Sequence, residues 1–136
     1  IMAQASDYME SAVLTGLLGG TSITLSSGKP YIALLTSAPS DSSSGTECTG
    51  GGYARVQIGD TNQGDFTIDS TGQATNSAEF KFDDATGNWG NITHIALMDA
   101  STAGNMLLYG SLTTPVAINT GDIFKIPASG FTIQMD

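Results

Sequence analysis

The sequence predicts an all-β fold, a single-domain antiparallel β-sandwich of jelly-roll type with one short N-terminal α-helix. Short apolar segments of strand-like composition recur about ten times, separated by turn signals roughly every 8 to 12 residues, as in sandwiches and barrels. Only one stretch, near the N-terminus, has the period of a helix. The 136 residues fit one domain over 1–136, with the β-sandwich over 22–136.

The N-terminal helix is predicted over residues 5–19, around the sequence DYMESAVLTGLLGG. Asp7 can cap its first turn, and Glu10 follows three residues later, as in a capping box. Both acids suit the positive end of the helix dipole. Gly19 and Gly20 then provide a stop signal.

An apolar stripe runs along this predicted helix. Met9, Val13 and Leu17 recur at four-residue spacing, and Leu14 and Leu18 join them. A stripe of this kind needs a surface on which to lie. That surface is either the core of the domain itself or a neighbouring subunit.

The rest of the chain consists of predicted strands and turns. Residues 31–37 form a nearly continuous apolar run, which is typical of a strand buried on both faces. Residues 38–52 are small and polar and are expected to form an exposed loop. The other expected strands lie within 22–25, 53–59, 65–70, 77–83, 92–100, 105–113, 114–127 and 130–135.

The sequence TECTGGGYARV, residues 46–56, links that loop to a strand. Its glycines do not form a phosphate-binding loop, because Tyr53 and Ala54 follow them instead of Lys-Ser/Thr and no helix opens there. We expect them to allow a positive φ or a close backbone approach. Arg55 is the only arginine, and it pairs either with an acid of the same chain or, bidentately, with an acid of a neighbouring subunit.

Charge excludes several classes of partner. The chain has 4 basic and 13 acidic residues, a net charge of −9. Binding to nucleic acid or to an anionic membrane surface depends on clustered Lys and Arg, so neither is expected. No apolar run approaches the roughly 20 residues of a membrane span. The acidity serves solubility or fits a basic partner surface.

Residues that carry catalytic chemistry are scarce. Cys48 is the only cysteine and lies in a loop without a nearby base, so we expect an incidental thiol. His94 is the only histidine, and its place within a strand favours a structural role. An enzyme that uses His94 with Asp83 or Asp84 is a remote alternative. No catalytic residue and no cofactor are therefore predicted.

Metal sites have little support in the sequence. A single histidine cannot build a multi-histidine site. The segment DTNQGD, residues 60–65, places Asp60 and Asn62 at the first two ligand positions of a calcium loop. Gly64 then occupies the third position and Thr71 the twelfth, where glutamate is required. Ordinary polar turns are the expected structure, and no metal is predicted.

The order of motifs from residue 30 onward resembles a known family. The most specific segments are GGGYAR, WGNITHIALMDA and LLYGSLTTP, and the N-terminal DYMESAVLTGLLGG also fits. Together they resemble small virion proteins of tailed bacteriophages, variously described as tail fibre, head fibre or capsid decoration (cement) proteins. The resemblance covers nearly the whole chain.

This resemblance implies a non-enzymatic structural protein of the virion. The first hypothesis is a capsid decoration protein on the exterior of the head, bound to the major capsid protein and assembled as a homo-oligomer, by analogy a trimer. The alternative is a tail- or head-fibre component that binds a host receptor or glycan. In that case Tyr53, Trp89 and Tyr109 are candidate stacking platforms, and otherwise they pack in the core.

Contacts between subunits are the one kind of site that the sequence predicts. The candidates are apolar residues of the helix stripe, the lone arginine, and polar or aromatic residues near the loop and strands. They are Met9, Val13, Leu17, Glu47, Tyr53, Arg55 and Trp89.

Overall fold

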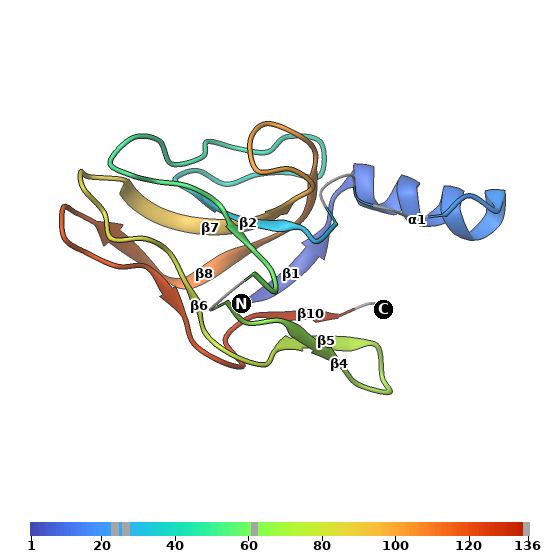
Figure 1. Ribbon diagram of the computed structural model, residues 1–136. Helices are drawn as coiled ribbons and strands as arrows, with labels where there is room; N and C mark the ends of the chain where they lie inside the picture. The colour runs from blue at the N-terminus through green and yellow to red at the C-terminus, as the bar shows by residue number, and fades with distance from the viewer. Residues whose placement is uncertain (23–24, 26–27, 61–62, 135–136) are drawn as a thin grey trace.

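The computed structural model describes residues 1–22, 25, 28–60 and 63–134. Within these ranges it has ten strands and one helix, which confirms the all-β class with a single N-terminal helix (Figure 1). Residues 23 and 24 of the strand expected over 22–25 lie outside the described residues.

Eight strands form one continuous sheet in the order β3-β2-β7-β8-β1-β10-β5-β4, and β6 and β9 form a two-stranded ribbon. The bounds are β1 Met2–Ala5, β2 Tyr31–Leu35, β3 Val56–Gln57, β4 Phe66–Ile68, β5 Gln73–Asn76, β6 Phe80–Lys81, β7 Gly90–Met98, β8 Met106–Ile118, β9 Lys125–Ile126 and β10 Thr132–Gln134.

The two layers of the fold are halves of this one curled sheet (Figure 1). Strand β1 joins them. It pairs antiparallel with β8, where Gln4 lies opposite Tyr109, and parallel with β10, where Met2 lies opposite Thr132. The sequence analysis did not predict β1, because four residues of mixed polarity carry little strand signal.

The main core lies between the layers and is rich in aromatic rings. Phe82 packs edge-to-face on Phe124, with ring centroids 5.7 Å apart, and Phe66 packs in the same way on Phe131 at 5.4 Å. Strand β2 is buried on both faces, as predicted. Its Ile32 and Leu34 belong to the main core, whereas Ala33 and Leu35 belong to a second cluster on the other face of the sheet.

Helix α1 spans Asp7–Gly19, within the predicted range. The N-cap is Ser6, not Asp7 as predicted, because the chain leaves β1 in extended geometry and the Ser6 hydroxyl accepts a hydrogen bond from the Met9 amide at 3.2 Å. The predicted stop is confirmed, since Gly20 is left-handed with φ 68°.

Glycines 50–52 all have positive φ, as expected of this link between loop and strand. Gly51 also approaches Gly87 so closely that a Cβ on Gly51 would lie 2.7 Å from the Gly87 carbonyl oxygen. The Gly51 carbonyl accepts hydrogen bonds from the Thr86 amide at 2.8 Å and from Trp89 Nε1 at 2.9 Å. The glycines therefore serve backbone packing.

Alanine at Gly51 tests this close approach against alanine at Gly50. Both residues have positive φ, so each substitution costs about 1–2 kcal/mol in backbone strain. Nothing lies within 4 Å of a Cβ on Gly50, so only Gly51→Ala adds a steric clash, at about 1–3 kcal/mol. Urea unfolding should show a clearly larger loss for Gly51→Ala, and equal losses would contradict the close contact.

Candidate assembly site

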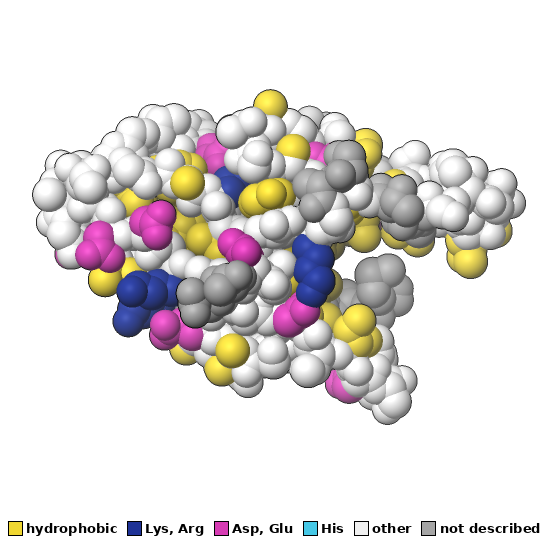
Figure 2. Space-filling view, viewed as in Figure 1, with side chains coloured by type: hydrophobic (Ala, Val, Ile, Leu, Met, Phe, Trp, Pro, Cys, Tyr) yellow, Lys and Arg dark blue, Asp and Glu magenta, His cyan; other side chains and the backbone are white. Residues whose placement is uncertain are grey.

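Helix α1 projects from the β body (Figure 1). None of its residues is buried. Leu14, Leu17 and Leu18 have exposed fractions of 56%, 74% and 79%. Figure 2 shows hydrophobic side chains along the underside of the projecting helix, and no charged side chain is visible there in this view.

Hydrogen bonds at Ser6 fix the direction of the helix. The Ser6 amide donates to the Leu107 carbonyl at 2.9 Å, and its hydroxyl donates to the carbonyls of Met106 and Leu107 on β8. The Asp7 amide donates to the Asp41 carbonyl at 3.1 Å. The first turn is thus tied to the sheet, and the later turns extend away from it.

The predicted apolar stripe is divided by this geometry. Met9 packs against the main core, Val13 is half-buried, and Leu17 is exposed. Of these three residues, Met9 is the one that packs against the described part of the core. The last two turns, with Leu14 and Leu18, lack such a surface within the described chain.

A shallow groove follows another side of the same helix. Its volume is about 280 Å³. The side chains along it are mostly small, and none carries a charge at neutral pH. They are Tyr8, Ser11, Ala12, Thr15, Gly16, Thr21 and Ser22.

The exposed leucines have the properties of a contact surface. Large apolar side chains that gather on one exposed surface, unlike singly scattered ones, are characteristic of interaction sites. A helix as short as α1 is only marginally stable in water without packing partners. Contact with another protein would therefore both cover the leucines and stabilise the last two turns.

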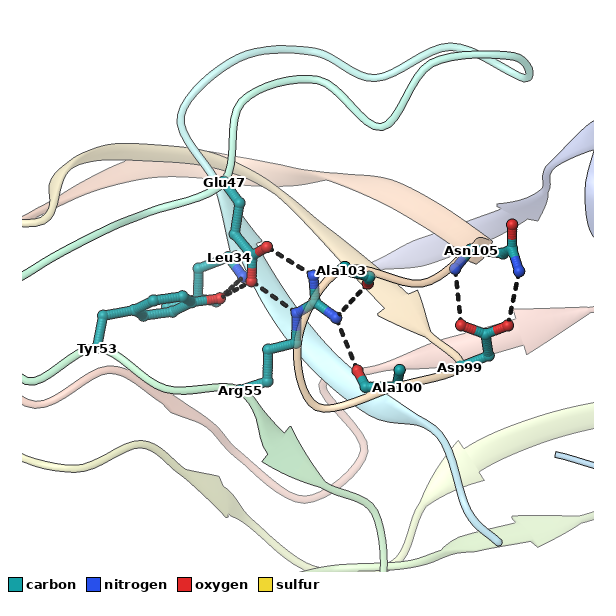
Figure 3. Close-up of polar contacts among 8 residues, drawn as sticks. All are labelled: Leu34, Glu47, Tyr53, Arg55, Asp99, Ala100, Ala103 and Asn105. Carbon is teal, nitrogen blue, oxygen red and sulfur yellow. Dashed lines mark hydrogen bonds and ion pairs between the residues drawn. The ribbon is translucent and has the colours of Figure 1, made fainter. Parts of the chain in front are cut away.

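A second group of predicted residues meets inside the body, as Figure 3 shows. The Arg55 guanidinium holds the Glu47 carboxylate bidentately, with Nε–Oε1 at 2.8 Å and Nη2–Oε2 at 2.7 Å. Its Nη1 donates to the carbonyls of Ala100 and Ala103 at 2.7 and 2.8 Å. Only 5% of the Arg55 side chain and 28% of the Glu47 side chain are exposed.

Tyr53 completes this group, which we name the Arg55 clasp and define as Glu47, Tyr53 and Arg55. The Tyr53 hydroxyl donates to Glu47 Oε1 at 2.7 Å and accepts from the Leu34 amide at 2.9 Å. Its ring packs edge-on to Trp89 at 5.4 Å. The clasp therefore connects the loop over 38–52, the turn after β7 and strand β2.

The clasp also shifts the pKa of the Glu47 carboxyl. Burial acts to raise this pKa, but hydrogen bonds from Arg55 and Tyr53 and the charge of Arg55 outweigh burial and lower it. Burial, followed by the negative charge of Glu47, raises the pKa of the Cys48 thiol to about 11. Cys48 is buried and stays protonated at neutral pH, as expected for an incidental thiol.

The structure resolves several alternatives for the predicted residues. Arg55 pairs with an acid of its own chain. Trp89 and Tyr109 are 4% and 8% exposed, so core packing is confirmed for both and neither is an open stacking platform. Glu47, Tyr53 and Arg55 come together in the clasp, apart from the helix. Their role in subunit contacts, like that of Trp89, remains a prediction.

Two features of the site were not predicted from the sequence. The first is the cap, which was expected at Asp7 although the short side chain of Ser6 before an acidic turn is itself a cap signal. The second is the division of the apolar helix residues, which were all expected to lie on one surface. The helical period locates Leu18 on the stripe but cannot tell which turns leave the body, because that depends on β1.

The structure also places the residues that were considered for catalysis and metal binding. His94 is half-buried, and its Nδ1 lies 2.8 Å from the Thr93 hydroxyl. Asp60 is exposed, and Asn62 of the calcium-like segment lies outside the described residues. Within the described ranges, no three His, Cys, Asp or Glu side chains cluster as metal ligands. Nor does any described helix have the length and apolar character of a membrane span.

Replacement of Arg55 by methionine tests the clasp. It would remove the guanidinium that donates to the Glu47 carboxylate and to two carbonyls, leaving Glu47 only the Tyr53 hydroxyl, and we expect a loss of about 3 kcal/mol in the free energy of unfolding. The matched control is Lys29→Met, which removes the surface ion pair with Asp65 and should cost less than about 1 kcal/mol. Denaturant titration measures both, and similar losses would refute the clasp's contribution.

The pH dependence of stability gives a second test. Because the folded pKa of Glu47 is lowered, its contribution is fully present above the ordinary glutamate pKa, about 4.3, and is lost as pH falls through the lower folded value. From pH 6 to pH 3 the wild type should therefore lose more stability than Glu47→Gln. Glu79→Gln, at an exposed site, is the control and should follow the wild type.

Comparison with known proteins agrees with this structural character. A protein-family model described as podophage GP4 fiber I protein gp80 matches residues 4–134, from β1 through β10. No curated protein matches the chain. The match confirms the resemblance to structural proteins of bacteriophage virions. The chain belongs to the family of the podophage GP4 fiber I protein gp80.

Proposed function

We propose that the protein is a fibre component of a podophage-type virion, in which the β body is a rigid structural unit and helix α1 is its assembly element. The observation that carries the proposal is the family match over residues 4–134, whose printed description is a fibre protein. The projecting, uncharged end of helix α1 supports its proposed role as the assembly element.

The body has the features of a mechanical part. Its two layers belong to one sheet, so that separating them requires breaking β-ladder hydrogen bonds as well as the core. The later part of the loop over 38–52 is fastened to β2 and to the residue that follows it. The Thr36 amide donates to the Thr46 carbonyl at 2.8 Å, and the Cys48 amide donates to the Leu34 carbonyl at 3.0 Å. Rigidity of this kind suits a subunit that transmits force.

A fibre component and a capsid decoration protein require different contact surfaces. A decoration protein spreads across neighbouring capsid subunits, which requires a broad contact face. Here the clustered exposed leucines are confined to α1, whereas other exposed large apolar side chains, such as Ile68 and Val116, lie on separate strands. A narrow attachment of this kind favours the fibre. The buried Trp89 and Tyr109 give no support to a glycan site, so the proposal includes none.

Copy number and location on the virion test the proposal. Quantitative mass spectrometry of purified particles gives the ratio of this chain to the major capsid protein, and labelled antibodies viewed by electron microscopy give its place. A fibre component should be present in a few to some dozens of copies at discrete positions, following closed symmetry. Hundreds of copies spread over the head would overturn the fibre proposal and establish decoration.

A further inference from the structure

Helix α1 carries two exposed surfaces that differ in shape. The first is a ridge, defined as Leu14, Leu17 and Leu18. The second is the groove of about 280 Å³ described above, in which Ser11, Ala12, Thr15 and Gly16 form the wall supplied by the helix. Helices pack when the ridges of one enter the grooves of another, so these surfaces are of complementary type.

The groove is large enough for ridge side chains. A cavity of about 150 Å³ accommodates a benzene molecule, so 280 Å³ leaves room for one or two leucine side chains. The small residues of the wall let another helix approach closely. Tyr8, 47% exposed, also lines the groove and adds apolar ring surface.

Charge favours a second copy of the chain as the occupant. Two molecules of net charge −9 repel each other, and most surfaces bring acids together. From Ser11 to Gly20 the helix has no ionisable side chain, so the ridge of one copy can enter the groove of another without apposing like charges. A basic partner would gain nothing from this uncharged segment.

We propose that α1 packs against α1 of another copy, with the leucine ridge of one inserted into the groove of the next. This inference rests on the proposed role as an assembled fibre component and names its partner. Because ridge and groove are different surfaces, the contact is heterologous, and successive copies form a ring or an open chain. The contact area is small, so association of the isolated protein should depend on concentration.

Three variants of the full chain test this inference. The ridge variant is Leu17→Gln/Leu18→Gln, and the groove variant is Thr15→Arg. Gln and Arg are good helix formers, and Arg lowers the net negative charge, so neither a weaker helix nor greater repulsion accounts for a loss of association. The control is Ile68→Gln on β4, where Ile68 is 76% exposed, close to the values of Leu17 and Leu18.

Light scattering coupled to size exclusion measures mass across a concentration series, and far-UV circular dichroism verifies the fold. The wild type and Ile68→Gln should rise above the monomer mass of 13.9 kDa, and the ridge and groove variants should remain at it. An equimolar mixture of these two variants retains one intact ridge–groove pair, so it should form dimers and nothing larger.

Each other outcome overturns the inference. A monomeric wild type shows that α1 does not bind a second copy. Association of the groove variant at the wild-type level shows that leucines pack on leucines or that another surface is used. If the Ile68→Gln variant is also monomeric, the loss of association is not specific to substitutions in the helix. A monomer that is nevertheless located at fibre positions on the virion refutes this inference alone and leaves the proposed function standing.

Discussion

The double pairing of strand β1 is the constraint on which the rest of the structure depends. Its first two residues pair with β10 and its last two pair with β8, and this turns two groups of strands into one curled sheet around an aromatic core. The next residue, Ser6, donates to β8 carbonyls and caps α1. The element that joins the two halves of the sheet therefore also sets the direction in which the helix leaves the body.

Polar interactions inside the β body also stabilise it. The Arg55 clasp surrounds a buried guanidinium with a carboxylate and two carbonyls, all of which accept its hydrogen bonds. It fastens a glycine- and serine-rich loop that has little apolar surface of its own. The clasp thus stabilises the body, whereas the end of α1 leaves its leucines exposed for contact.

The sequence was informative where local chemistry decides structure. The helix range, the doubly buried β2 and the positive-φ glycines follow from period, apolar runs and glycine spacing. Contacts between distant segments could not be predicted from the sequence. The partner of Arg55 depends on the loop returning to β2, and the exposure of Leu17 depends on β1, whose sequence MAQA carries little strand signal. The spacing of Met9, Val13 and Leu17 does not indicate that Met9 packs on the core while Leu17 is exposed to solvent.

The central claim is that the last two turns of α1 form the assembly surface of a rigid virion part. Hydrogen–deuterium exchange of the amides in residues 11–19 tests it most directly, by comparing dilute monomer with the protein in purified virions. The account predicts slow exchange in the virion and fast exchange in the monomer, with the β4–β5 hairpin unchanged as an internal reference. Equally fast exchange of the helix in both states would contradict the claim.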